Sequence, residues 1–210
     1  VSPTLGYAMG VGLILAGVAV GFVPHWQLAV TVAAYVALTT SYSFWLKHIA
    51  VVDLVAIAAG FVLRAIGGAT ATGVPISNWF FIVASFGSLF IVAGKRSGEM
   101  GELAGDAGTI RPTLEVYTTS YLAYLRSVSS GVMLVAYCLW SFEKADLADA
   151  GGLPYYQLSI VPFAVAILRY AMLLDLGHGS TPEEIALHDR PFQIAIAIWL
   201  VIFGCGIYLL

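Results

Sequence analysis

Long apolar runs separated by short polar loops form the main pattern of this sequence. Each run approaches the ~20 residues that a helix needs to cross a bilayer. Because a helix satisfies its backbone hydrogen bonds internally, these runs predict an all-α, polytopic membrane bundle with seven transmembrane helices. The seven runs are Leu5–Val23, Gln27–Ser43, Ile49–Ala69, Trp79–Gly94, Tyr121–Phe142, Tyr156–Leu174 and Phe192–Leu210.

Composition agrees with a membrane protein. Hydrophobic residues make up 60% of the 210 residues and the mean hydropathy is +0.91, whereas soluble domains are roughly 45–50% apolar. Four of the five tryptophans lie at or beside run ends, where the ring stays in hydrocarbon while its N–H reaches water. Cys138 and Cys205 fall inside apolar runs, which indicates packing residues rather than a disulfide or metal site.

The basic residues between the runs predict the orientation. One side, which also holds Val1, carries five of them in its loops, and the other side carries only Lys144. This bias places the first side in the cytoplasm and predicts a multi-pass protein of the plasma (inner) membrane. The five residues are Lys47, Lys95, Arg96, Arg111 and Arg190.

Charge is concentrated in the segment 94–111, although charged residues make up only 10% of the chain. The segment holds three of the nine basic residues and three of the twelve acids, and the segment 175–191 is also rich in acids. Acids can hold a magnesium ion while Lys or Arg binds phosphate oxygens, so this face could bind a metal and a polyphosphate together. The alternative is a pair of solvated loops.

Arg64 is the one basic residue well inside a predicted span. A guanidinium there costs roughly 2.5–3.5 kcal/mol on insertion scales, so a functional role or an internal partner is expected. Asp53 lies eleven residues earlier, which is about 16 Å along a helix at roughly 1.5 Å per residue. Asp53 is therefore too far away to be a direct partner.

Three cytoplasmic segments and the helix around Arg64 resemble those of a known family. Residues 42–47 read YSFWLK, residues 60–68 read GFVLRAIGG, residues 94–99 read GKRSGE, and Arg169 and Asp189 flank an acidic loop. In this order and spacing, they resemble the UbiA superfamily of intramembrane prenyltransferases. Within it the chain is most similar to the decaprenyl-phosphate phosphoribosyltransferase branch, and the resemblance covers essentially the whole chain.

The resemblance implies one transmembrane domain over residues 1–210, equivalent to helices three to nine of a nine-helix fold. The family's first Asp-rich motif, which holds magnesium on the diphosphate, has no counterpart here. Because Val1-Ser2-Pro3 resembles the linker that follows this motif, we expect the motif and two helices to belong upstream. Glu99 is the one possible metal ligand that the resemblance leaves in this chain, and the catalytic residues stay unassigned.

The activity implied by the resemblance is transfer of 5-phosphoribose from phosphoribosyl diphosphate to polyprenyl (decaprenyl) phosphate. Diphosphate is released, Mg²⁺ is the cofactor, and the product serves cell-wall arabinan synthesis. One alternative is a UbiA-type prenyltransferase with an aromatic or lipid acceptor; another is a transporter or channel, although the interrupted repeats of transporters are not seen. Membrane lipid is an expected partner, nucleic acid is not, and a homo-oligomer is left open.

Site residues are carried over from the resemblance one by one. Tyr42 and Lys47 are candidates for diphosphate contacts. Lys95 and Arg96 are candidates for the ribose phosphate or the lipid phosphate, since two cations beside one acid suit an extra phosphate better than a second metal. Alternatively, these cations are topology signals and the acids near Asp175 a solvated cap. The substrate-binding set is Tyr42, Lys47, Arg64, Lys95, Arg96, Glu99, Arg111, Asp175 and Arg190.

Overall fold

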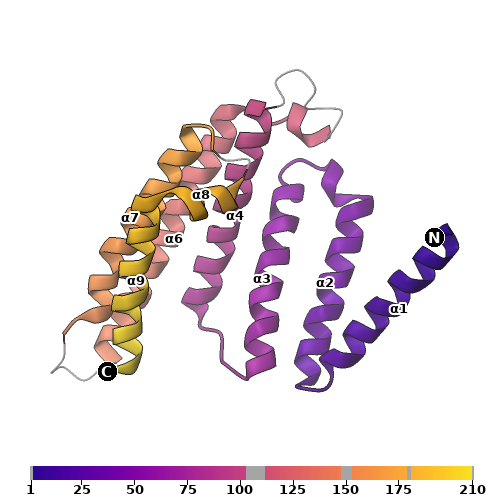
Figure 1. Ribbon diagram of the computed structural model, residues 1–210, viewed down its shortest axis with the longest axis horizontal. Helices are drawn as coiled ribbons and strands as arrows, with labels where there is room; N and C mark the ends of the chain where they lie inside the picture. Colours follow the sequence, from indigo (N-terminus) through magenta and orange to yellow (C-terminus); the bar gives the residue numbers. More distant parts are fainter. Residues whose placement is uncertain (1, 103–111, 148–152, 179–180, 210) are drawn as a thin grey trace. The chain divides into compact units, whose positions relative to one another are not determined.

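The structure, a computed structural model, describes residues 2–102, 112–147, 153–178 and 181–209, and most of these residues are helical (Figure 1). No β-strand occurs within these ranges. The all-α prediction is therefore confirmed. The chain divides into two compact units, which we call unit 1 (Val1–Ser77) and unit 2 (Asn78–Leu210). The prediction of a single domain over residues 1–210 stays a prediction.

Unit 1 is built from three long helices and one short one. Ser2 begins the first helix, because its hydroxyl accepts a hydrogen bond from the Leu5 N–H at 3.4 Å. Gly21 allows the first two helices to approach closely, since a Cβ there would lie 2.9 Å from the Ala29 Cα. The elements are α1 (Pro3–Gly21), α2 (Trp26–Phe44), the 3₁₀ helix η1 (Leu46–His48) and α3 (Val52–Thr72).

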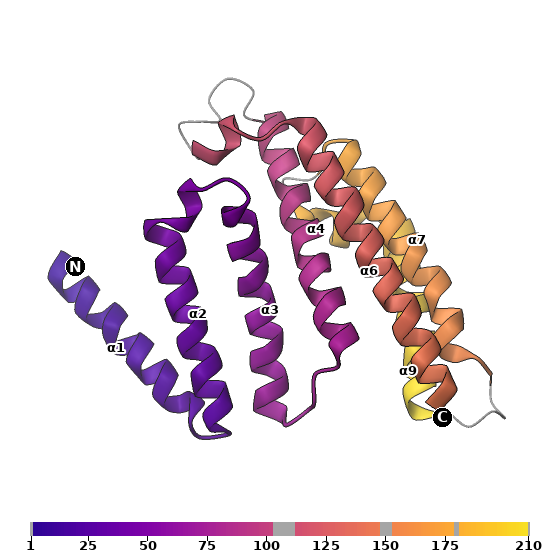
Figure 2. The ribbon, with the colours of Figure 1, turned by 180° about the vertical axis from the view of Figure 1, so that it is seen from behind.

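Unit 2 contains four long helices and two short ones. Helix α4 packs along α6, α9 packs along α7, and α6 joins the two pairs by contacting α7 (Figure 2). The buried core contains Phe90, Met133, Tyr170, Leu173, Leu174 and Ile185. The elements are α4 (Asn78–Glu102), η2 (Pro112–Glu115), α6 (Thr119–Leu147), α7 (Tyr155–Asp175), α8 (Pro182–His188) and α9 (Arg190–Tyr208).

The last turn of α7 packs against α4, about two turns before α4 ends, near the end of unit 2 that is uppermost in Figures 1 and 2. A Cβ on Gly94 would lie only 2.6 Å from Leu174 Cδ1, so glycine lets α7 pack directly against α4 there. The segments that follow these two helices therefore begin at the same end of the unit. This arrangement within unit 2 agrees with the predicted topology, in which the loops after Gly94 and after Leu174 share a side.

An aromatic cluster joins α6, α7 and α9 inside unit 2. The Tyr137 and Ser159 hydroxyls share a hydrogen bond at 2.7 Å, and the Trp199 indole N–H donates to the Tyr137 hydroxyl at 2.6 Å. The Tyr137 ring stacks on Phe163, with 4.1 Å between the ring centres. These polar groups are satisfied within the cluster, which therefore fixes three helices against one another without an ionised side chain.

All seven predicted runs are helical, and the largest boundary difference is in α4. The sequence predicts a helix that ends at Gly94, with a charged loop beyond it, but α4 continues to Glu102. Arg96 and Glu99 are one turn apart on this extension and form an ion pair, which supports the helix. The prediction that Lys95, Arg96 and Glu99 lie in a loop was therefore wrong.

Six helices in the described residues are long and apolar enough to cross a membrane: α1, α3, α4, α6, α7 and α9. Helix α2 is a long helix outside this set, and it is rich in hydroxyl side chains. Thr31, Thr39 and Ser43 each donate to a backbone carbonyl of the preceding turn at 2.8–2.9 Å, so these hydroxyls are satisfied within the helix. The fold is that of a multi-pass membrane protein, while the count of seven spans stays a prediction.

Candidate functional site

In unit 1, Tyr42 and Lys47 lie close together in the chain, where α2 ends and η1 follows. Tyr42 is half-buried near the end of α2, and Lys47 is exposed in η1. Val51, four residues further on, has a φ of 69°. A β-branched residue is strained in this left-handed region, and such strain is concentrated at functional sites. The structure thus places Lys47 four residues before an unusual backbone turn.

Arg64 has the internal partner that its position in a span predicts. Its Nη2 donates to the Tyr35 hydroxyl at 2.6 Å. The guanidinium carbon also lies 5.2 Å from the ring centres of Tyr35 and Phe61, a distance at which cations interact with aromatic faces. Because a phenol is neutral, these contacts stabilise the charge of Arg64 without cancelling it.

In unit 2, the cations at the end of α4 occupy different environments. Arg96 is only 2% exposed, and its Nη1 lies 2.6 Å from Glu99 Oε2. Lys95 is exposed, although it is the neighbouring residue. The structure therefore brings Arg96 and Glu99 together and leaves Lys95 accessible to water or a ligand. Arg111, the last cation of this predicted set, lies outside the described residues.

Asp175 forms an ion pair with a residue that the predicted site lacks. Arg126, in the first turns of α6, is 8% exposed, and its Nη2 donates to Asp175 Oδ1 at 2.5 Å. The Asp175 side chain is 71% exposed. We call this contact the open pair, because a single oxygen of a largely solvated carboxylate makes it. The only available sequence signal for Arg126 was a guanidinium within an apolar helix.

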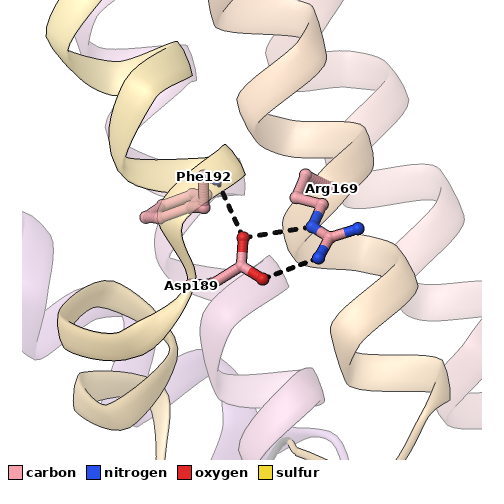
Figure 3. Close-up of polar contacts among 3 residues, drawn as sticks. All are labelled: Arg169, Asp189 and Phe192. Carbon is pink, nitrogen blue, oxygen red and sulfur yellow. Dashed lines mark hydrogen bonds and ion pairs between the residues drawn. The ribbon is translucent and has the colours of Figure 1, made fainter.

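A second Arg–Asp pair joins α7 to the start of α9 (Figure 3). Arg169 donates from Nε and Nη2 to the two carboxylate oxygens of Asp189, at 3.0 and 2.7 Å. Asp189 also accepts a hydrogen bond from the Phe192 N–H at 2.8 Å, so it caps the N-terminus of α9. We call this contact the closed pair. Arg190 follows it directly but is exposed.

The electrostatics of Asp189 fit a permanently ionised carboxylate. The hydrogen bonds from Arg169 are the main reason that its pKa is lowered, and the Phe192 N–H adds to the effect, while partial desolvation opposes it. Hydrogen bonds to the charged form favour that form. Asp189 therefore carries a structural negative charge at neutral pH.

A cavity of about 440 Å³ lies at the end of α7, beside α8 and the cap of α9. All of its lining residues come from the segment 173–189, and none of the described residues in the segment 95–120 contributes. A polar cavity that both segments share therefore stays a prediction. The lining residues are Leu173, His178, Thr181, Glu184, Ile185, His188 and Asp189.

No metal cluster is present in the part of the chain that the structure describes. Within these residues, no group of three or more His, Cys, Asp or Glu side chains could hold a metal ion. Glu99, the possible magnesium ligand, instead pairs with Arg96. The described residues therefore do not by themselves fit a magnesium site.

These features define a polytopic helical membrane protein with ionic pairs gathered where its helices end. The chain matches the UbiA prenyltransferase family over residues 1–197, and it belongs to that family. This confirms the resemblance on which the predicted site was based.

Three curated relatives carry the name decaprenyl-phosphate phosphoribosyltransferase. The chain is 43% identical to the protein of Mycolicibacterium smegmatis over 187 residues, which is 87% of this chain and 59% of the relative. It is 36% identical to the Corynebacterium glutamicum protein over 98% of this chain and 62% of the relative. It is 36% identical to a Mycobacterium tuberculosis protein over 97% of this chain and 66% of the relative. The chain thus spans about three-fifths of the length of these relatives.

Proposed function

We propose that the protein transfers 5-phosphoribose from phosphoribosyl diphosphate to a polyprenyl phosphate, of the decaprenyl class, and releases diphosphate. The single observation that carries this proposal is 36–43% identity, over 87–98% of the chain, to relatives named decaprenyl-phosphate phosphoribosyltransferase. The product would then serve as a precursor for cell-wall arabinan. The reaction would take place at the cytoplasmic face of the plasma membrane, where the basic loops are expected.

The chemistry explains why cations belong in this site. Breaking the C–O bond to diphosphate leaves positive charge on the ribose carbon and adds negative charge to the leaving group. Fixed Lys and Arg side chains in a site of restricted water stabilise that negative charge. We assign Tyr42 and Lys47 to the diphosphate, and Lys95 and Arg96 to the ribose phosphate or the lipid phosphate. Arg64, Glu99, Arg111, Asp175 and Arg190 complete the proposed substrate-binding set.

We propose that the reaction uses magnesium, because the resemblance to the family implies this cofactor. It would neutralise charge on the diphosphate. Because the described residues form no metal cluster and Glu99 pairs with Arg96, no magnesium ligand is assigned among them. Membrane lipid is a proposed partner because the acceptor is a lipid, and a homo-oligomer is compatible with the proposal.

The second candidate function is a prenyltransferase that moves a polyprenyl group from its diphosphate to an aromatic or lipid acceptor. The family match favours it, because the family as a whole carries the prenyltransferase name. Both reactions release diphosphate, but the donors differ: one is a water-soluble sugar phosphate and the other is a lipid.

Donor discrimination tests the proposal. Membranes that contain the intact protein are incubated with phosphoribosyl diphosphate labelled in the ribose, together with polyprenyl phosphate, and the lipids are then extracted. We expect label in the lipid phase only when both substrates are present. Membranes without the protein are the control. Label that stays in water, combined with turnover of a polyprenyl diphosphate, would overturn the proposal in favour of the second candidate.

A further inference from the structure

Arg126 is incompletely satisfied in the described structure. A guanidinium has five N–H donors. The Nη2 group donates to Asp175 Oδ1 at 2.5 Å, but Nη1 is buried and has no hydrogen-bond partner within the described ranges. A buried donor without an acceptor is costly, and more so when it belongs to a cation. The Nη1 group of Arg126 is therefore available to donate hydrogen bonds to an anion.

Asp175 is poorly suited to be the permanent partner of Arg126. It contacts the guanidinium through one oxygen, and its side chain is 71% exposed, so water competes for the same carboxylate. Exposed ion pairs contribute about 0–1 kcal/mol on average, so exchange of this carboxylate for a better acceptor is cheap. Asp175 is also the last residue of α7, where the chain leaves the helix.

The open pair lies at the end of unit 2 that also holds Arg96. Leu174, the residue before Asp175, packs against Gly94, and Arg96 follows two positions later in α4. Two buried guanidiniums, Arg96 and Arg126, therefore occur where α4 ends and α6 begins. Phosphate groups are the chemical class that such a pair of cations would suit.

We propose that Arg126 binds a substrate phosphate and that Asp175 occupies its place when the site is empty. The proposal rests on the proposed function, and it deepens that function by naming a binding residue and its competitor. A phosphate offers three strong acceptor oxygens, so it can accept from both terminal nitrogens of Arg126, whereas Asp175 uses one. The phosphate belongs either to the sugar diphosphate donor or to the polyprenyl phosphate acceptor, which share this chemistry.

The exchange has a physical benefit for turnover. While the site is empty, the carboxylate keeps the buried guanidinium oriented. After reaction, the same carboxylate competes for Arg126 and repels the departing phosphate group, because both are anions. Asp175 therefore lowers the affinity for the phosphate that Arg126 binds, and the two residues act in opposite directions.

The proposal predicts that variants of Arg126 and Asp175 change the KM of one substrate in opposite directions. In the intact protein, Arg126→Ala should raise the KM of one substrate by about 10- to 150-fold, the range of a charge-assisted contact. Asp175→Asn should lower the KM of that same substrate by about 1.5- to 5-fold, because it removes a weak competing partner. Since Asp175 is exposed, its variant should fold even where the Arg126 variant does not. An unchanged or raised KM for both substrates in Asp175→Asn would overturn the proposal.

Two KM measurements, one for each substrate, identify the source of the phosphate. KM is measured for phosphoribosyl diphosphate at saturating polyprenyl phosphate, and then for polyprenyl phosphate at saturating donor. The substrate whose KM moves in opposite directions in the two variants supplies the group that Arg126 binds. Asp189→Asn is the matched control, because it alters the closed pair; it should lower the melting temperature without changing either KM.

A binding measurement separates this proposal from the proposed reaction. The melting temperature of purified wild-type protein and of both variants is measured with inorganic phosphate and with inorganic diphosphate, neither of which requires turnover. We expect stabilisation by at least one anion to increase in Asp175→Asn and to fall in Arg126→Ala. If the wild type forms no phosphoribosyl lipid but this pattern holds, only the reaction is refuted. If product forms but the pattern is absent, the role of Arg126 is refuted.

Discussion

Helix α7 takes part in two Arg–Asp pairs that have the same chemistry but different geometry. In the closed pair, Arg169 uses two nitrogens and Asp189 uses both oxygens, and a third hydrogen bond comes from the Phe192 N–H. In the open pair, Arg126 and Asp175 share one hydrogen bond. Burial is also reversed, because the acid is the sheltered partner in the closed pair and the base is sheltered in the open pair.

The difference shows how a structural ion pair can be distinguished from an exchangeable one. Both oxygens of Asp189 already accept hydrogen bonds, so this carboxylate gains little from a new partner, and the closed pair acts as a structural link between α7 and α9. A buried guanidinium such as that of Arg126, whose Nη1 has no partner among the described residues, gains from a multidentate anion. The number of contacts per group, together with which partner is buried, separates the two roles better than the presence of an ion pair.

The largest predicted effect concerns Arg96, whose pair with Glu99 extends the comparison to a third site. If Lys95 and Arg96 hold a phosphate, Lys95→Ala or Arg96→Ala should each lower kcat/KM by about 10- to 150-fold. Arg96→Lys should restore only part of the activity, because an ammonium cannot reproduce a planar fork. Activity is compared at matched membrane expression, and near wild-type turnover in both alanine variants would refute the phosphate contact.

The next prediction compares stability. Asp189→Ala removes the pair with Arg169 and the N-cap of α9 together, so the melting temperature should fall by several degrees. Asp175→Ala removes one contact of a carboxylate that is 71% exposed, and water can take its place on Arg126 Nη2, so the melting temperature should change far less. Thermal unfolding of both variants in the same detergent is the measurement. Equal losses of melting temperature in the two variants would contradict the interpretation that the closed pair is structural and the open pair is exchangeable.

A smaller effect should separate the two arginines when each is replaced by lysine. Arg169→Lys cannot keep a two-nitrogen contact with Asp189, so it should lose most of the stability that Arg169→Ala loses. Arg126→Lys can keep a single contact with Asp175, so it should lose less than half of what Arg126→Ala loses. Melting temperatures of the four variants give the two ratios, and similar ratios would contradict the geometry.

The smallest effect is expected from pH. The pKa of Asp189 is lowered below its usual 3.8, so its contribution to stability is fully present above the unfolded value and is lost as pH falls through the folded value. The difference in melting temperature between wild type and Asp189→Asn should therefore stay constant from about pH 8 to pH 5, and shrink below about pH 4. Asn keeps the capping function, so this variant isolates the charge. A difference that varies near neutral pH would show that another group titrates with the pair.

The helices themselves could be predicted from the sequence, because each apolar run records the burial or lipid exposure of one element. The end of α4 could not be placed, because Lys95, Arg96 and Glu99 were interpreted as a loop. The spacing of Arg96 and Glu99 is nevertheless that of helix neighbours, so the signal was present. Local charge spacing thus deserves as much weight as charge density when a helix end is predicted.

The ionic partners could not be predicted, because they are distant in the chain. Arg126 and Asp175 are 49 residues apart, and Arg169 and Asp189 are 20 apart. Which acid meets which base depends on how α6, α7 and α9 pack, and a single sequence does not record that packing. Arg64 shows the same limit: the need for a partner could be predicted from its place in a span, but its contact with Tyr35 could not.

Asp189 both caps α9 and pairs with Arg169, and these two contacts determine the position at which α9 packs during assembly. A membrane-spanning helix can slide and rotate with little change in apolar contact, because lipid is as apolar as the side chains of its neighbours. Asp189 removes that freedom, since its carboxylate meets Arg169 only when α9 begins at Arg190. A slip by one residue would break the contact with α7 and the cap at the same time. The closed pair therefore selects one position of α9 against α7 among several positions that would make similar apolar contacts.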